Sequence, residues 1–272
     1  MSNRYKVDHD LHIHTKLSSC SGDPEQSAQR LLEYAKSNGF SRICVTDHYW
    51  DSESDGASPW YKPQNFEQIS SIKPLPTAEG IDFLFGAETE FSRKFEVAMP
   101  KWRFDSFDFV IIPTTHLHMN GLTIEQSDVD SPDTNKIRAG LWVRRLECLL
   151  DKDLPFHKIG IAHLACSLLH NRGTFDDYLD TLKNIPDEDM ERLFARAAEV
   201  GCGIELNQYD IMSVQKEPEI VGRMFRIAKE QGCKFYMGSD AHHPAEFKKA
   251  KECFEYAVDL LGLKENDKFN IG

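Results

Sequence analysis

Short apolar runs alternate with longer amphipathic segments along most of this chain. The run 42–46, Arg-Ile-Cys-Val-Thr, is typical of a buried strand, whereas the segment 245–261 places its apolar residues on one face at the i, i+3, i+4, i+7 spacing of a helix. Seven strands are predicted, near residues 7–14, 42–46, 81–85, 107–112, 158–162, 202–206 and 234–238. Further helices are predicted near residues 24–37, 136–151, 187–200 and 217–231. Strands that alternate with helices form mainly parallel sheets, so the pattern predicts an α/β protein built as a (β/α) barrel.

No linker rich in proline or serine divides the chain, and no internal repeat is apparent. We therefore expect one barrel domain over residues 1–272, with its core at about 7–262. The segments at about 50–80 and 117–135 are rich in Asp, Ser and Pro. This composition predicts two long loops rather than core elements.

The charge balance is acidic, because 44 Asp and Glu residues against 32 Lys and Arg residues give a formal net charge of −12. Such a surface repels polyanions, so we expect no long nucleic acid and no membrane as a partner. A small phosphorylated substrate remains compatible, since bound metal ions and a few local cations can neutralise its charge. No apolar run approaches a membrane span, no signal peptide is recognisable, and the seven cysteines form no Cys-x-x-Cys pair. These features predict a cytoplasmic protein and leave its oligomeric state open.

Residues that commonly bind metal ions follow nearly every predicted strand. The first strand runs into His12 and His14, and the last runs into Asp240 and His242. Side chains two residues apart on a strand point to the same side, so each pair can bind one ion. The candidates at the other strand ends are Asp47 with His48, Glu88, His116 with His118, His163 and Glu205. Because the strand ends of a barrel converge on one face, we expect these side chains to meet there.

A single His-x-His pair is a weak indication, because short motifs often occur by chance. The series is much stronger, since independent accidents would scatter the histidines over helices and loops. Imidazole and carboxylate ligands together suit zinc, iron or manganese. A cluster that mixes them is suited to activating water and binding a phosphoryl group. The residues therefore predict a metal-dependent hydrolase.

Taken in order, these segments resemble the motifs of the PHP superfamily, the polymerase and histidinol phosphatase domains. The matching segments are Asp10–Thr15, Val45–His48, Gly86–Glu88, His116, Ile161–His163 and Gly238–His242. The resemblance runs from about residue 7 to residue 262. It implies a single distorted, seven-stranded, TIM-like (β/α) barrel. It also implies a phosphoesterase with two or three divalent metal ions, which can be zinc, manganese or iron.

The resemblance also implies which residues bind each ion. The first ion would be bound by His12, His14, Glu88 and Asp240, the second by Glu88, His116 and His163, and the third by His48, His242 and Cys20. Many family members have histidine at the position of Cys20, and Asp23 is the alternative ligand here. Glu205 and Asn207 match a Glu-x-Asn segment of the family and are expected to orient ligands rather than to bind metal.

Two of these assignments have close alternatives. Glu90 lies two residues after Glu88 and points the same way if the segment is extended. His118 stands in the same relation to His116. Glu88 is preferred because it directly follows Gly-Ala, as in the family, and His116 because it is nearer the end of its strand.

The implied mechanism is hydrolysis of a phosphate ester. Asp240 or a metal-bridging water would accept the proton, and His242, if it is not a ligand, would assist the leaving alkoxide. Arg93 and Arg172 follow two of the strand-end motifs and are candidates to bind the substrate phosphate.

Histidinol phosphate is the named candidate among small phosphomonoesters, because chain length and single-domain layout resemble those of stand-alone histidinol phosphatases. A phosphodiesterase that acts on short nucleotides is one alternative. A non-catalytic, metal-stabilised binding module is another. An amidohydrolase is disfavoured, because no lysine stands at a predicted strand end.

Overall fold

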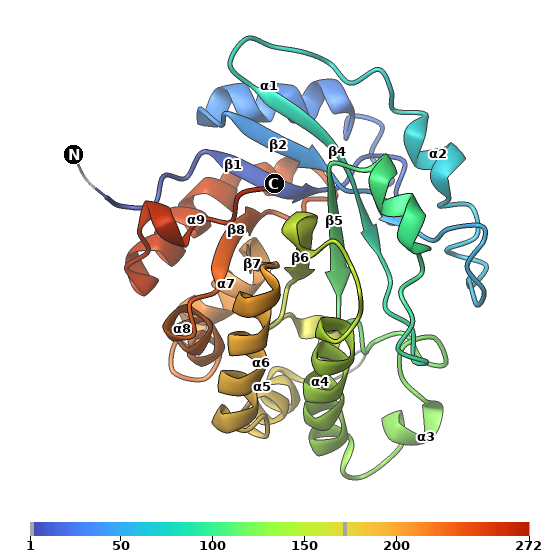
Figure 1. Ribbon diagram of the computed structural model, residues 1–272, viewed down its shortest axis with the longest axis vertical. Helices are drawn as coiled ribbons and strands as arrows, with labels where there is room; N and C mark the ends of the chain where they lie inside the picture. The colour runs from blue at the N-terminus through green and yellow to red at the C-terminus, as the bar shows by residue number, and fades with distance from the viewer. Residues whose placement is uncertain (1–2, 171–172, 272) are drawn as a thin grey trace.

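The computed structural model describes residues 3–170 and 173–271, and its parallel strands form one strongly curved sheet (Figure 1). The strands are β1 (His9–Ile13), β2 (Arg42–Val45), β3 (His48–Tyr49), β4 (Asp82–Thr89), β5 (Phe109–Pro113), β6 (Ile159–Ala162), β7 (Gly203–Asn207) and β8 (Lys234–Gly238). Their order is β1-β2-β4-β5-β6-β7-β8, and the short β3 pairs with β4. Just after β8, Ala241 forms a parallel bridge with Ile13 of β1. The sheet is therefore nearly closed into a barrel, and the seven predicted strands are confirmed with β3 as an addition.

Helices flank the outer face of this sheet (Figure 1). They are α1 (Ala28–Asn38), α2 (Phe66–Ser70), α3 (Gln126–Val129), α4 (Thr134–Leu150), α5 (Phe175–Lys183), α6 (Asp187–Val200), α7 (Gln208–Lys216), α8 (Gly222–Glu230) and α9 (Phe247–Leu261). Short 3-10 helices lie at Lys101–Ser106, Phe156–Lys158, Ser167–Leu169, Pro244–Glu246 and Glu265–Asp267. Within the described ranges, no helix has the length and apolar character needed to cross a membrane.

Some helix boundaries differ from the predicted ones for local reasons. Helix α1 begins four residues later than predicted, because the side chain of Ser27 accepts a hydrogen bond from the backbone N–H of Arg30 and caps the helix there. The helix predicted over 217–231 is confirmed as α8, which begins five residues later than predicted, whereas α7 was not predicted. Pro218 separates the two helices, because it lacks a backbone N–H and interrupts helices. Helix α7 follows β7 directly, and the side chain of Asn207 caps it.

The two predicted long loops are confirmed, although each contains one short helix. Helix α2 lies within 50–80, and α3 lies within 117–135. The first loop follows β3 and the second follows β5. Both therefore begin at the C-terminal ends of strands, the end of a barrel where functional sites are built.

A small apolar cluster fills the interior of the barrel. The rings of Phe109 on β5 and Tyr236 on β8 meet edge to face, with their centroids 5.1 Å apart, although these two strands are not neighbours in the sheet. Leu11 of β1 and Cys44 of β2 join the same cluster. A much larger cluster packs between the sheet and the surrounding helices. Apolar packing thus occupies the middle of the barrel and leaves the C-terminal strand ends to polar side chains.

Candidate metal centre

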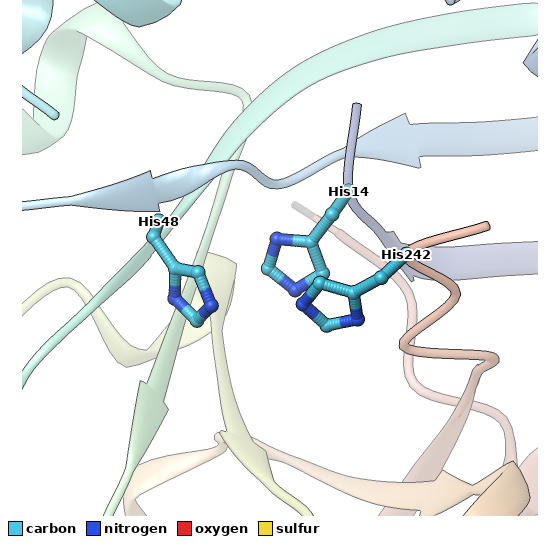
Figure 2. A group of neighbouring side chains, drawn as sticks. All are labelled: His14, His48 and His242. Atoms are coloured by element: carbon cyan, nitrogen blue, oxygen red, sulfur yellow. The ribbon is translucent and has the colours of Figure 1, made fainter. Parts of the chain in front are cut away.

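The predicted ligands gather at the C-terminal ends of the strands. Three groups of side chains place their ligand atoms within 4.8 Å of one another, namely His12–His14–Asp240, Glu88–His116–His163 and His14–His48–His242. Figure 2 shows the third group: the ring of His14 stacks on that of His242, with centroids 4.1 Å apart, and lies 4.4 Å from the ring of His48. Every predicted ligand except Cys20 belongs to at least one group, and each group could hold a metal ion.

The ring of His12 is oriented by a buried carboxylate. Its Nδ1 lies 2.7 Å from Oε1 of Glu205 and therefore donates a proton, because a carboxylate accepts. The other oxygen of Glu205 accepts from the backbone N–H of His163 at 2.6 Å. Gly238 leaves room for this contact, since a Cβ there would lie 1.9 Å from Oε1 of Glu205. Glu205 thus fixes the tautomer of His12 and leaves its Nε2 as an acceptor, in agreement with the orienting role predicted for it.

The ring of His14 is oriented in a similar way by a hydroxyl. Ser18 Oγ donates to Asp47 Oδ1 at 2.7 Å and accepts from the backbone N–H of His48 at 3.0 Å. Because its one proton is already used, its 3.1 Å contact with His14 Nδ1 requires that nitrogen to donate. The Nε2 atoms of His12 and His14 then both carry lone pairs, and they lie 3.1 Å apart. Two facing lone pairs repel each other, whereas a cation between them would be held by both.

Glu88 lies at the centre of the cluster. Its Oε1 is 3.1 Å from His163 Nε2, and its Oε2 is 2.9 Å from His48 Nδ1. Burial alone would raise the pKa of Glu88, but the facing imidazoles of His48 and His12 hold it well below its usual value. Among the described residues, neither Glu88 Oε2 nor His48 Nδ1 has a hydrogen-bond partner of acceptable geometry, although both atoms are buried. Buried polar atoms are rarely left unsatisfied, and a divalent ion would satisfy both, so the donor set fits a metal centre.

Two candidate ligands also have strained backbones. Asp240 has a φ of 53° and His163 a φ of 28°, in the left-handed region that residues other than glycine rarely adopt. The backbone N–H of Asp240 donates to the carbonyl of His12 at 2.7 Å, which helps to hold this conformation. Such strain persists only where the surroundings enforce it, and it concentrates at functional sites. The backbone strain of Asp240 and His163 thus indicates a functional site at the same place as the three side-chain groups.

The structure distinguishes Glu88 from Glu90, and His116 from His118, as candidate ligands. Glu90 is fully buried beside the cluster, but its Oε1 accepts from Tyr61 Oη at 2.6 Å and lies 2.5 Å from His116 Nδ1. Glu90 therefore orients His116, whose Nε2 faces Glu88 at 3.8 Å. His118 lies next to His116, with ring centroids 5.2 Å apart, and belongs to none of the three groups. The arrangement thus favours Glu88 and His116 as ligands over Glu90 and His118.

Cys20 lies beside the cluster without joining a ligand group. Its side chain lines the same cavity as His48 and His242, and burial raises the pKa of its thiol to about 12. In the group that contains those two histidines, His14 takes the place predicted for Cys20. The alternative ligand Asp23 instead pairs with His243 Nε2 at 2.8 Å.

We expect Cys20→Ser to leave the number of metal ions per chain unchanged, because three histidines already form the third group without the thiol. The metal content of purified protein, measured by elemental analysis, checks this. Cys148→Ser on α4 is the matched control. Loss of one ion in Cys20→Ser alone would assign the thiol as a ligand after all.

A cavity of about 510 Å³ opens over the cluster. One side of its lining consists of candidate ligands, including Glu88 and Asp240. The other side comes from the loops after β3, β5 and β6 and is mostly apolar: Trp60, Tyr61, Met119, Leu122 and Leu168. The sequence predicted the first two of these loops but not their part in the site, because loop residues follow no periodic pattern. The aromatic pair at 60–61 within a polar loop was the one available signal.

The two predicted phosphate-binding arginines do not appear in the described lining of this cavity. The guanidinium of Arg93 donates to the carbonyl of Gly121 at 2.8 Å and pairs with the carboxylate of Glu125. Arg93 is thus engaged elsewhere in the structure. Arg172 lies outside the described residues.

A buried arginine of α4 was missed by the sequence reasoning. Arg145 is fully buried, and its guanidinium donates to the carbonyls of Thr114 at 2.7 Å, Ser92 at 3.1 Å and Thr123 at 3.3 Å, and also to that of Phe91. These carbonyls belong to the segments that follow β4 and β5. One side chain thus joins the loops that carry Glu90 and His116.

A comparison with known proteins identifies a solved structure of similar fold. No protein-family profile matches the sequence, and no curated protein sequence matches it. Among solved structures, a similar one is the crystal structure of histidinol phosphate phosphatase from Lactococcus lactis subsp. lactis, complexed with zinc, L-histidinol and phosphate. The TM-score is 0.56, the sequences are 16% identical, and the match covers 97% of this chain and 98% of that chain. The chain therefore shares the fold of this phosphatase over nearly its whole length, which confirms the predicted TIM-like barrel.

Proposed function

We propose that this protein is a metal-dependent phosphatase that hydrolyses a small phosphomonoester. The observation that carries the proposal is the convergence of eight predicted ligands, from six strand ends, beneath a cavity of about 510 Å³. Buried atoms in the cluster without partners, Glu88 Oε2 and His48 Nδ1, support a role in holding metal ions. The similar fold of a phosphatase that was crystallised with zinc, histidinol and phosphate supports the reaction class.

The proposed ligands would hold two or three divalent ions, with zinc, manganese and iron as candidates. His12, His14, Glu88 and Asp240 would bind the first, and Glu88, His116 and His163 would bind the second. His14, His48 and His242 surround the third position. When bound, such ions activate a water molecule and offset the negative charge of the phosphoryl group.

In the proposed reaction, water attacks phosphorus, the bond from phosphorus to the ester oxygen breaks, and the products are inorganic phosphate and an alcohol. Asp240 is the proposed proton acceptor, because its Oδ1 lies at the cluster, 3.1 Å from His14 Nε2. His242 donates its Nδ1 proton to the carbonyl of Asp240 at 2.8 Å, so its Nε2 is the atom that faces the cluster. This arrangement favours His242 as a ligand over His242 as the acid that protonates the alcohol.

The decisive experiment is a phosphatase screen on purified protein that has been stripped of metal and then reloaded with Zn²⁺, Mn²⁺ or Fe²⁺. Histidinol phosphate is the first substrate to test, together with other phosphomonoesters and the diester bis-nitrophenyl phosphate. We expect metal-dependent release of phosphate from monoesters, and its loss in a folded His14→Ala variant. Preference for the diester would favour the phosphodiesterase alternative. Absence of any metal-dependent turnover would refute the enzymatic proposal.

A further inference from the structure

The wall of the cavity that faces away from the metal centre is mostly apolar. It is formed by Trp60, Met119, Leu122 and Leu168, and the polar groups nearby come from Ser58, Asn120 and His118. Within the described part of the lining, no lysine or arginine is present. This wall would contact whatever group is attached to the phosphate.

Trp60 is held in a defined position at this wall. Its ring meets the ring of His48 at a centroid distance of 5.3 Å and that of Tyr61 at 4.6 Å, edge to face in both cases. Tyr61 is itself fixed, because it is buried and donates its hydroxyl proton to Glu90. Trp60 nevertheless remains 40% exposed. An ordered, exposed indole next to a candidate metal ligand is suited to pack against an apolar or aromatic ligand group.

The charges of the lining disfavour a substrate that carries an ammonium group. Its carboxylates, Glu88 and Asp240, both face the imidazoles of the metal centre. Among the described lining residues, no carboxylate therefore remains to pair with an ammonium group of a substrate. Enclosing an unpaired ammonium against an apolar wall is unfavourable, because the charge loses its hydration without gaining a partner.

On these grounds, and on the basis of the proposed phosphatase function, we propose that the substrate is a phosphate ester of a neutral alcohol that carries an aromatic ring. The ring packs between Trp60 and the apolar side chains of the loop after β5, while the phosphate lies at the metal centre. The cavity volume of about 510 Å³ is adequate for a ring on a short linker. An amino alcohol such as histidinol presents a suitable ring but also an ammonium group that this wall does not match.

The test compares two esters that differ only in the ammonium group, 3-phenylpropyl phosphate and phenylalaninol phosphate, with histidinol phosphate and glycerol phosphate as further substrates. We expect kcat/KM of the metal-loaded enzyme to be at least about tenfold higher for the neutral aromatic ester than for the other three. Trp60→Ala should lower kcat/KM for 3-phenylpropyl phosphate by about tenfold and reduce its advantage over glycerol phosphate. Trp102→Ala is the matched control, because Trp102 is also exposed but lies outside the cavity lining.

A binding measurement separates this inference from the proposed activity. The non-hydrolysable analogue 4-phenylbutylphosphonate should bind the metal-loaded protein in calorimetry, with a Kd about tenfold weaker in Trp60→Ala than in Trp102→Ala. Equal or better turnover of phenylalaninol phosphate or histidinol phosphate would overturn the inference, as would equal phosphonate binding by the two variants. If neither these esters nor any other substrate of the phosphatase screen is hydrolysed, the proposed function fails, and the phosphonate still decides what the cavity binds.

Discussion

Glu88→Gln is expected to remove most of the bound metal and to lower kcat/KM of the proposed phosphatase by on the order of 10³-fold. Glu88 contributes both of its oxygens to the cluster, and these lie close to imidazole nitrogens of four histidines from three strand ends: His12, His14, His48 and His163. Glutamine has nearly the same size but lacks the charge that attracts a divalent ion. Its amide N–H₂ would also point a donor where a ligand atom is needed. Elemental analysis and steady-state kinetics on the same preparation measure the two effects together.

Two further variants show whether the effect is specific to Glu88. Glu90→Gln should lower metal affinity or activity by only about 10- to 100-fold, because Glu90 orients His116 rather than facing the ions. Glu96→Gln, an exposed change in the same loop, should behave like the unmodified protein. A larger effect for Glu90→Gln than for Glu88→Gln would exchange the roles assigned to these two carboxylates.

Arg145→Met is expected to lower the free energy of unfolding by about 3 kcal/mol or more. The substitution leaves buried carbonyls, including those of Thr114 and Ser92, without a donor. Methionine keeps the apolar contacts of the side-chain stem but cannot donate. Burial lowers the pKa of Arg145 to about 10, which reflects how far this cation is removed from water. Denaturant unfolding of metal-free protein measures the effect without a contribution from bound ions.

The neighbouring Arg144→Met provides the matched control, because Arg144 is exposed on the same helix and its removal should change stability by about 0.5 kcal/mol at most. Arg145→Lys keeps the charge but loses the planar fork that reaches several carbonyls at once, so an intermediate loss is expected. We also expect Arg145→Met to weaken metal binding, since Thr114 lies two residues before His116. Equal stability of Arg145→Met and Arg144→Met would show that the carbonyls find other partners.

Much of the fold and of the candidate site could be predicted from the sequence, because both depend on strand ends. A buried strand is visible as a short apolar run, and a barrel brings all its C-terminal strand ends to one face. For this reason His12 and Asp240, more than two hundred positions apart, could be assigned to one group from the sequence alone. Less regular elements were harder: α7 begins directly after β7, so the strand and the helix merge into one continuous pattern.

The remaining features depend on contacts that no local pattern encodes. Tyr61 distinguishes Glu90 from Glu88 as a candidate ligand, because its hydroxyl, which comes from a distant loop, donates to Glu90. Trp60 lies in the same loop, and the position of its side chain relative to the cavity follows from tertiary packing alone. Arg145 was overlooked because arginine is mostly exposed, and an arginine in an amphipathic helix is therefore expected to face solvent.

The apolar cluster inside the barrel has a consequence for the order of events in a catalytic cycle. Phe109 and Tyr236 fill the space beneath the metal centre, so molecules enter and leave through the mouth of the cavity beside Trp60. In the proposed phosphatase, the phosphate lies at the closed end and the alcohol lies between it and solvent. The alcohol must then depart first, and the phosphate leaves last. Inorganic phosphate should consequently act as a competitive product inhibitor, and its release would set an upper limit on turnover.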